Sequence, residues 1–199
     1  ITKNPAIRIL YVSSTSGLAV KQLKFIKDIL TSKIYSRYWP EMINQEESKR
    51  EKWTETEIAV DHPKRAAETV RDSTIFTAGL TTSITGLHCD VAIFDDIVVR
   101  ENALTEEGRS KVEAQVSLLA SIQGADAEVW AVGTRYHPLD LYSTLMNTVI
   151  EMYDSQGNVT DTGFLYETFE RQVEDRGDGT GNFLWPRTQR KDGTWFGFN

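Results

Sequence analysis

The sequence has one cysteine, three histidines and no long apolar run. Because Cys89 is alone, no disulfide can form within the chain, which is typical of proteins from reducing compartments. The histidines, His62, His88 and His137, do not have the spacing of metal ligands. No apolar stretch approaches the ~20 residues that a membrane-spanning helix needs. We therefore expect neither a disulfide framework, nor a histidine metal site, nor a membrane partner.

A phosphate-binding loop of the form G-x-x-x-x-G-K-[ST] is also missing from the sequence. The nearest candidate is the stretch SSTSGLAVKQ (13–22), which joins a predicted strand to a predicted helix. It has a single glycine, and Lys21 falls inside the helix rather than at its start. This stretch therefore cannot wrap a triphosphate.

Charge is distributed unevenly along the chain. The net charge is −7, yet residues 1–38 carry seven Lys or Arg against one Asp, which gives +6. Residues 73–199 carry nine basic against nineteen acidic residues, which gives −10. A chain with this balance is not an electrostatic nucleic-acid binder over its whole surface, so any DNA contact has to be local.

Hydrophobic patterning predicts an α/β fold with a mostly parallel sheet flanked by helices. Short apolar runs alternate with amphipathic stretches, the arrangement that buries a parallel sheet on both faces. Near the end of the chain the pattern changes to an alternation around Gly157 and Asn158, which predicts a C-terminal β-hairpin within 148–171. The predicted strands lie within 7–14, 74–86, 90–96 and 128–134, and the predicted helices are 16–30, 105–121 with Thr105 as N-cap, and Pro138 through Leu145.

Polar residues end three of the predicted strands. Ser13 and Ser14 follow the first, Asp95 and Asp96 end the strand DVAIFDD, and Gly133-Thr134-Arg135 ends the next. In parallel α/β sheets ligands bind at the carboxyl ends of the strands. Two adjacent carboxylates repel and are costly in an apolar setting, so a bound cation or proton is expected to compensate them.

An apolar strand that ends in two acids is the Walker B arrangement. In it the first carboxylate holds Mg²⁺ on nucleotide phosphates and the second orients the attacking water. Strand-terminal aspartates also cap helices, start turns or bind metals in nucleases, and a Gly-Thr-Arg strand end can be a simple turn with a surface arginine. Read alone, each pattern leaves these alternatives open.

Taken together, several motifs resemble the ATPase domain of large terminase subunits, the DNA-packaging motors of tailed bacteriophages. The resemblance covers about residues 5–190 and includes FLWPR (183–187) near its end. The motifs that carry it are Thr85-Gly86, Asp95-Asp96, Gly133-Thr134-Arg135-Tyr136-His137 and Asp140-Leu141.

The resemblance implies ATP and Mg²⁺ as cofactors and assigns roles to matching residues. Asp95 would be the magnesium ligand, and Asp96 would take the place of the catalytic carboxylate, which in many relatives is Glu. Gly133 and Thr134 would contact the nucleotide. Arg135 would act with Thr134 in the motif that couples hydrolysis to movement. His137 and Asp140 are expected to shape the following turn and cap the next helix.

The resemblance also implies the organisation and partners of the chain. Residues 1–147 would form a P-loop NTPase core of the ASCE type that lacks its N-terminal strand, 148–190 the end of the ATPase domain with the hairpin, and 191–199 a connector toward a nuclease domain. The partners would be double-stranded DNA, the portal protein, the small terminase subunit and further copies in a ring. The motor would work in the host cytoplasm, transiently at the procapsid portal.

Three alternatives remain at this point: a metal-dependent nuclease that uses Asp95 and Asp96, a helicase segment, and a non-enzymatic α/β scaffold. Asp175 and Asp178 are interpreted as turn residues rather than metal ligands. We also expect two unpaired sheet edges with an apolar groove where the P-loop strand belongs, and no ATP hydrolysis by these residues alone.

Overall fold

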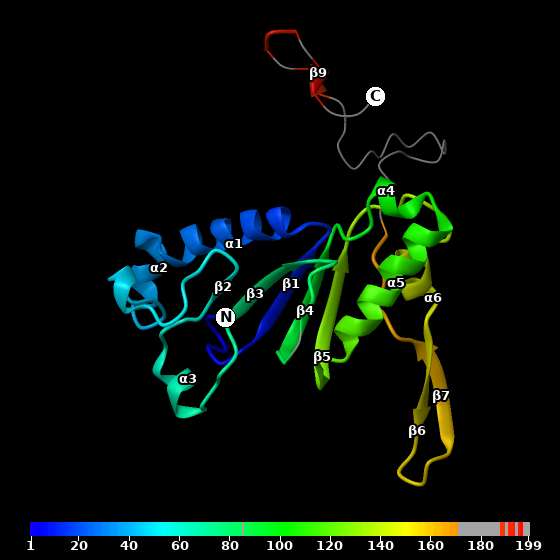
Figure 1. Cartoon of the computed structure of the whole chain (residues 1–199), viewed down its shortest axis with the longest axis horizontal. Coiled ribbons are helices and arrows are strands. Elements are labelled where there is room, and N and C mark those ends of the chain that lie inside the picture. Colours follow the sequence, from blue (N-terminus) through cyan, green and yellow to red (C-terminus); the bar gives the residue numbers. More distant parts are fainter. Residues whose placement is uncertain (85, 171–187, 190, 194, 197–199) are drawn as a thin grey trace. The chain divides into compact units, whose positions relative to one another are not determined.

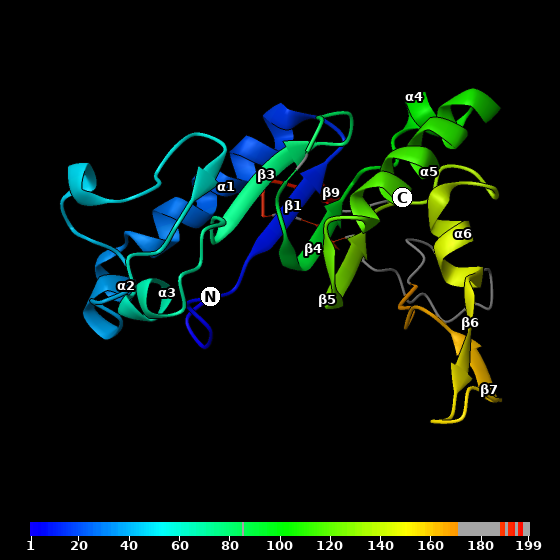
Figure 2. The same ribbon diagram turned by 60° about the horizontal axis from the view of Figure 1, so that its bottom comes forward.

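The chain contains a five-stranded, mostly parallel sheet. The computed structural model describes residues 1–84, 86–170, 188–189, 191–193 and 195–196. Strand order is β2-β3-β1-β4-β5 (Figures 1 and 2). All four longer strands run parallel, and β2 pairs antiparallel with β3 at one edge. The α/β class is therefore confirmed. The strands are β1 (Ile9–Ser13), β2 (Glu57–Ile58), β3 (Ile75–Gly79), β4 (Cys89–Asp95) and β5 (Gln123–Val132).

The two long helices begin and end where the sequence predicts. Thr15 caps the first through a bond from the Leu18 amide to its hydroxyl, at 3.3 Å, and Thr105 caps the second through the Gly108 amide at 3.1 Å. None of the described helices is both long and apolar enough to cross a membrane. The helices are α1 (Ser16–Leu30), α2 (Lys33–Tyr38), α3 (Pro63–Ala67), α4 (Arg100–Ala103), α5 (Glu106–Ala120) and α6 (Leu141–Asn147), with a 3₁₀ turn at Glu47–Lys49.

Some predicted boundaries were wrong. The helix predicted from Pro138 begins instead at Leu141, because the Asp140 carboxylate accepts a bond from the Ser143 amide and so caps the helix at that point. Strand β5 begins at Gln123, before the predicted start at residue 128. The short helices α2 and α3 carry too little periodicity to have been predicted.

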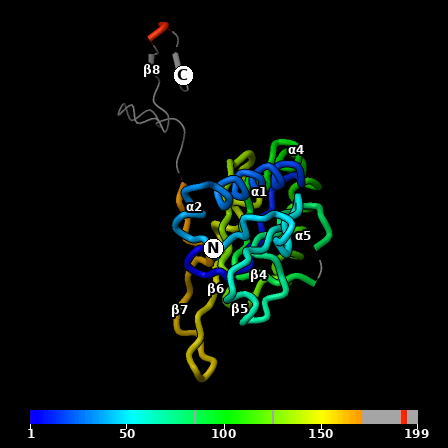
Figure 3. The backbone as a smooth tube through the Cα atoms, turned by 90° about the vertical axis from the view of Figure 1, so that its left-hand side faces the viewer, coloured from blue at the N-terminus to red at the C-terminus, as the bar shows by residue number. Residues whose placement is uncertain are grey.

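Both faces of the sheet contribute to the core. On one face, alternate residues of β1 and β4 are buried: Leu10, Val12, Ala92 and Phe94. The other face lies under α1, which packs on β1 and β3 and lies near the top of the view in Figure 3. There the buried cluster is formed by Leu23, Leu30, Tyr35, Met42, Ile43, Ile58, Val60 and Ile75, with Ile9 and Tyr11 packed against it.

The sheet is continuous, which corrects the expectation of a gap at its centre. Strand β1 pairs with β3 on one side and β4 on the other, and β4 pairs with β5. No apolar groove separates these strands. Apolar exposure is instead found on the edge strand β5, where Trp130 is 56% and Val132 60% exposed.

The chain divides into two compact units, Ile1–Thr144 and Leu145–Asn199. The second unit holds the predicted hairpin, formed by β6 (Val149–Tyr153) and β7 (Val159–Phe164) in antiparallel pairing. The turn between these strands places Gly157 at φ +85°. A shorter pair, β8 (Thr188–Gln189) and β9 (Trp195–Phe196), follows.

Candidate functional site

Three of the predicted strand ends meet at one edge of the sheet. Ser13, the last residue of β1, lies opposite Gly79 of β3 on one side and opposite Asp95 of β4 on the other. Asp95 in turn lies opposite Val132, the last residue of β5. The backbone therefore brings the Ser13, Asp95 and Gly133 regions side by side, as parallel pairing of their strands predicts.

A tyrosine from the neighbouring strand holds the first aspartate. The Tyr11 hydroxyl donates a hydrogen bond to the Oδ2 atom of Asp95. Burial raises the pKa of Tyr11, and the bond to Asp95 together with the charges of Asp95 and Asp96 raises it further. Tyr11 is therefore a neutral donor at physiological pH. This bond fixes the side-chain position of Asp95 at the end of the strand.

The second aspartate has an unusual backbone conformation. Asp96 has φ +46°, in the left-handed region that non-glycine residues rarely adopt. Its amide donates to the Val132 carbonyl at 2.9 Å, so it extends the β4–β5 ladder by one bond. Its side chain is exposed. Although the residue is exposed overall, partial burial of its carboxyl raises the pKa of Asp96, and the adjacent Asp95 charge adds to this shift.

Gly133 is required by the side chain that packs against it. A Cβ at this position would lie 1.9 Å from the Tyr142 hydroxyl oxygen, so only glycine leaves room for that ring. Tyr142 is buried at the start of α6, and its hydroxyl donates to the Val132 carbonyl at 3.2 Å. Burial raises its pKa to about 12, with smaller contributions from the charges of Asp96, Asp140 and Asp95. Tyr142 thus ties α6 to the end of β5.

Thr134 and Arg135, which follow Gly133, have other surroundings than the glycine. Thr134 is exposed. The Arg135 guanidinium lies 4.0 Å from the Oδ1 atom of Asp140 and contacts the Pro138 carbonyl at 3.5 Å. Asp140 is fully buried and also accepts bonds from the Tyr136 and His137 amides. Arg135 is therefore held against its own loop, and no contact with Asp95 or Asp96 is found among the described residues.

The start of α1 closes the site on the β3 side. A Cβ on Gly79 would lie 2.6 Å from the Ser16 amide nitrogen, so glycine at the end of β3 lets the helix approach closely. The Thr82 hydroxyl accepts a bond from the Gly79 amide and lies 3.3 Å from the Ser16 hydroxyl. Hydroxyl groups therefore line the strand ends beside Ser13.

The donor set fits magnesium that is bound mainly by phosphate and water. Nowhere in the described part of the chain do three or more His, Cys, Asp or Glu side chains gather as a metal cage. Mg²⁺ does not need such a cage, because it is usually bound through one or two carboxylates plus substrate phosphates. Asp95 and Asp96 supply that number, and their mutual repulsion would be relieved by a divalent cation.

Sequence reasoning did not identify Tyr11 or Tyr142 as part of the site. Tyr11 lies two residues before Ser13 and so on the same face of β1, but only the pairing of β1 with β4 brings it to Asp95. Three features of the sequence analysis fall outside the described residues, namely Thr85, the two aspartates Asp175 and Asp178, and the stretch 183–187.

Comparison with family models and with curated proteins gives no match for this sequence.

Proposed function

We propose that this chain is part of the ATPase domain of a terminase large subunit, a motor that hydrolyses ATP to move double-stranded DNA into a procapsid. One observation carries the proposal. Asp95 ends the internal parallel strand β4 and Asp96 follows it directly, with a Gly-Thr-Arg stretch beside them after the end of β5. Nucleotide-binding α/β proteins place their chemistry at this edge of the sheet.

In this mechanism each aspartate has its own role. Asp95, positioned by Tyr11, would hold Mg²⁺, which when bound neutralises charge on the transferred phosphate. Asp96 would accept the proton of the attacking water at a carboxylate oxygen. Its raised pKa favours this role, because a base works best when its pKa is nearer to the operating pH.

The strand end beside the aspartates would report the state of the nucleotide. The Thr134 hydroxyl and the Arg135 guanidinium are hydrogen-bond donors of the type that binds phosphate oxygens. Arg135 would have to exchange its contact with Asp140 for the nucleotide. That exchange offers a route by which hydrolysis could move the loop and α6, since Asp140 caps this helix.

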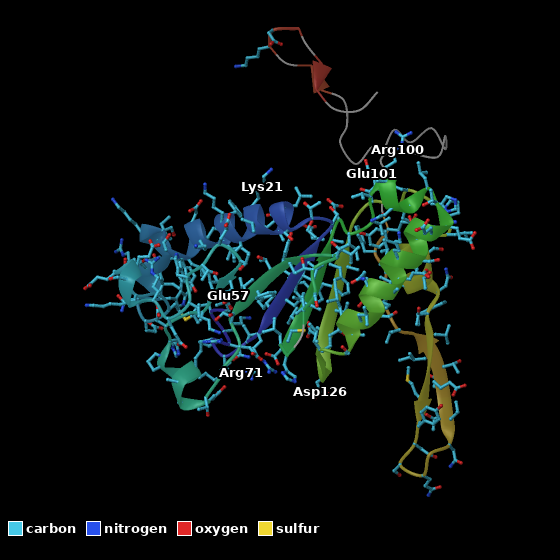
Figure 4. All side chains as sticks on the ribbon, in the orientation of Figure 1. Lys21, Glu57, Arg71, Arg100, Glu101 and Asp126 are labelled. Atoms are coloured by element: carbon cyan, nitrogen blue, oxygen red, sulfur yellow. The ribbon has the colours of Figure 1, made fainter. Side chains whose placement is uncertain are left out.

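The proposal requires a phosphate-binding loop from outside these 199 residues, because none of the stretches within them has the necessary glycines and lysine. Magnesium and ATP are its cofactors. Its partners are DNA, the portal protein, the small terminase subunit and further copies in a ring, in the host cytoplasm and transiently at the procapsid portal. A trans-acting arginine is also required. Arg71 and Arg109 donate hydrogen bonds to the carbonyls of Gly86 and Ala103, while Arg100 is exposed at the start of α4 (Figure 4).

The decisive test is DNA-stimulated ATP hydrolysis by the protein that joins this chain to its phosphate-binding segment, with and without Asp95→Asn. We expect the substitution to abolish hydrolysis and leave the fold intact. The matched control is Asp126→Asn, which removes an exposed carboxylate near the start of β5 (Figure 4). This control should hydrolyse ATP at the wild-type rate.

Hydrolysis that survives Asp95→Asn would contradict the proposal. Cleavage of DNA with Mg²⁺ or Mn²⁺, lost in Asp95→Asn while ATP is not hydrolysed, would replace it with the nuclease alternative. The described residues favour the ATPase, since a nuclease of the usual type uses further acidic ligands and no such group is found among them.

A further inference from the structure

The turn that joins β1 to α1 has no role in the proposed ATPase, although it lies at the same edge of the sheet as Asp95. Its sequence over residues 13–17 is SSTSG, which offers hydroxyl groups and backbone amides and no charged side chain. Strand β1 enters this turn where β3 and β4 also end (Figure 1). In α/β proteins, a turn that leads from a parallel strand into a helix is a common place for an anion to bind.

Helix α1 begins with two backbone amides that are not bonded. The Leu18 amide donates to the Thr15 hydroxyl at 3.3 Å, and the Ala19 amide donates to the Thr15 carbonyl at 3.2 Å. For the amides of Ser16 and Gly17, no hydrogen bond is found within the described residues. The first amides of a helix need a partner from outside it, and the dipole of a helix favours a negatively charged partner there.

A buried hydroxyl beside these amides also lacks a partner. Ser13 is 2% exposed, and in the part of the chain that the structure describes its Oγ atom takes part in no hydrogen bond. Tyr11 reaches Asp95 from the same face of β1, and Ser13 lies opposite Asp95 in the pairing of β1 with β4. Because neighbouring strands are about 4.8 Å apart, the Ser13 hydroxyl is directed into the space between Asp95 and the start of α1. A buried hydroxyl without a partner is costly, so a ligand that bonds it is favoured.

Two residues shape this space on the β3 side. A Cβ on Gly79 would lie 2.6 Å from the Ser16 amide nitrogen and 2.8 Å from the Ser16 Oγ atom, so any side chain there would cover the donors at the start of α1. The Thr82 hydroxyl lies 3.3 Å from the Ser16 Oγ atom. We call Ser13, Ser16, Gly17 and Thr82 the hydroxyl cup.

We propose that the hydroxyl cup binds a single phosphate ion, and that in the ATPase this is the phosphate that hydrolysis releases. The second half of this statement rests on the proposed function. One helix start and three hydroxyls suit one tetrahedral group, whereas the turn has too few glycines to wrap a triphosphate. The strand order places the cup and the Gly-Thr-Arg stretch on opposite sides of Asp95. A phosphate that leaves a nucleotide on the β5 side would therefore pass Asp95 to reach the cup.

The charges around the cup determine when it can bind phosphate. The donors of the cup are neutral, and the carboxylates of Asp95 and Asp96 lie at the adjacent strand end. These carboxylates repel a phosphate dianion, and a magnesium ion at Asp95 would compensate the repulsion. We therefore expect phosphate to bind more weakly when Mg²⁺ is removed with a chelator.

The test titrates the whole chain with inorganic phosphate in the presence of Mg²⁺ and follows the backbone amides by NMR. We expect the resonances of the Ser16 and Gly17 amides to shift. Ser13→Ala and Ser16→Ala should each weaken phosphate binding about tenfold or more, the usual effect of removing a hydrogen bond to a charged group. The matched control is Ser121→Ala, because Ser121 is exposed at the end of α5 and bonds the Leu118 carbonyl. It should bind phosphate like wild type.

Thermal melting separates a binding role of Ser13 from a structural one. Because its hydroxyl is not bonded, Ser13→Ala should melt at the wild-type temperature or above it when phosphate is absent. Phosphate with Mg²⁺ should then raise the melting temperature of the wild-type chain more than that of the variant, since only a bound ligand stabilises the folded state. A Ser13→Ala chain that melts at a lower temperature without phosphate would contradict the proposal.

Two further results would overturn the binding site: a wild-type chain whose Ser16 and Gly17 amides do not respond to phosphate, and undiminished binding by Ser13→Ala. ATP that shifts the same amides at lower concentration than phosphate would assign the cup to the nucleotide and overturn the assignment to the released ion. None of these measurements requires hydrolysis. A chain that binds phosphate in the cup while its ATP-hydrolysing parent proves inactive would contradict the proposed function and leave the phosphate site in place.

Discussion

At the scale of single residues, Asp96 combines two unfavourable features. Its φ of +46° lies in a region where Asp and Asn are tolerated better than other side chains, and its carboxylate adjoins that of Asp95. Backbone strain and like-charge repulsion of this kind are found more often at functional sites than elsewhere. Stability is therefore given up at a position where the proposed chemistry needs a base.

Asp96→Asn should stabilise the protein at neutral pH. Asn tolerates the same backbone conformation, and it removes the charge that the folded state disfavours. Because the pKa of Asp96 is raised in the folded state, this group favours folding at acid pH and opposes it as the pH rises through that pKa. We expect a gain of up to about 1 kcal/mol near pH 7, small because the side chain is solvated.

The gain should disappear once the pH falls below the ordinary aspartate pKa of about 3.9, because the carboxyl is then protonated in both the folded and the unfolded protein. Urea unfolding at both pH values measures it. In the protein that hydrolyses ATP, the same substitution should remove activity. A variant that is more stable and fully active would remove Asp96 from the proposed mechanism.

Tyr11→Phe should lower the free energy of unfolding by about 1–2 kcal/mol, since a partly buried carboxylate loses a hydrogen-bond donor. Because the pKa of Tyr11 is raised on folding, its contribution is complete below the unfolded value of about 10 and declines above it. The difference between the two proteins should therefore narrow in alkaline solution. Denaturant unfolding across this pH range measures the effect, and an unchanged difference would contradict it.

At the scale of elements, the junction of β5 with α6 determines the position of the Gly-Thr-Arg stretch. Tyr142 packs over Gly133 and donates to the Val132 carbonyl, and Asp140 caps the helix while facing Arg135. These contacts hold β5, the turn and α6 together. A change at Arg135 can thus be transmitted to the helix through Asp140.

Gly133→Ala should destabilise this junction by about 1–3 kcal/mol, the usual effect of overpacking a filled space, since the added methyl meets the Tyr142 ring. Tyr142→Ala in the same chain should relieve that clash, so the two substitutions together should cost less than the sum of their separate effects. A double-mutant cycle by urea unfolding measures the coupling. Strict additivity would show that the ring does not constrain residue 133.

The turn between β6 and β7 depends on a glycine in the left-handed region. Gly157 has φ +85° beside Asp154, whose carboxylate accepts bonds from the Asn158 and Gln156 amides. Gly157→Ala should destabilise the hairpin by about 1–2 kcal/mol because alanine resists that conformation. Faster hydrogen exchange of β6 and β7 amides measures it. The control is Gly17→Ala in α1, where an added methyl meets nothing within 4 Å and the helix should not be weakened.

At the scale of the whole molecule, the edge strand β5 exposes apolar side chains at one side of the sheet. An edge strand with apolar side chains is a site of aggregation or of pairing with another segment. Trp130 and Val132 are more than half exposed there, whereas Phe94 on the adjacent strand is 1% exposed. The proposed phosphate-binding segment would be one way to cover this edge.

Trp130→Thr should reduce aggregation and leave the free energy of unfolding within about 0.5 kcal/mol, because the ring is mostly in solvent. Phe94→Ala, in the core, should cost about 3–5 kcal/mol and make aggregation worse. Light scattering at fixed concentration, together with thermal melting, separates the two effects. Equal losses of stability in both variants would show that Trp130 is packed in the folded protein.

Local sequence determined the helices and strands with clear periodicity. The patterns of 16–30 and 105–121, the Thr105 cap and the apolar run before Asp95 predict α1, α5 and β4, since helix caps and alternation are properties of neighbouring residues. The Thr15 cap of α1 was not predicted. Local sequence also placed the two aspartates at a strand end. It failed for α6, where a buried Asp140 rather than Pro138 sets the start.

Tertiary structure alone decided which strands are neighbours, and with that the composition of the site. Tyr11 and Asp95 are 84 residues apart, and no local pattern relates them. The pairing of β1 with β4 depends on the crossover connections and on burial of both sheet faces. The free energies of both involve residues from the whole chain. The space that Gly133 leaves for the Tyr142 ring is likewise a result of tertiary packing. Asp95 and Asp96 could therefore be predicted from the sequence, whereas the side chains that surround them could not.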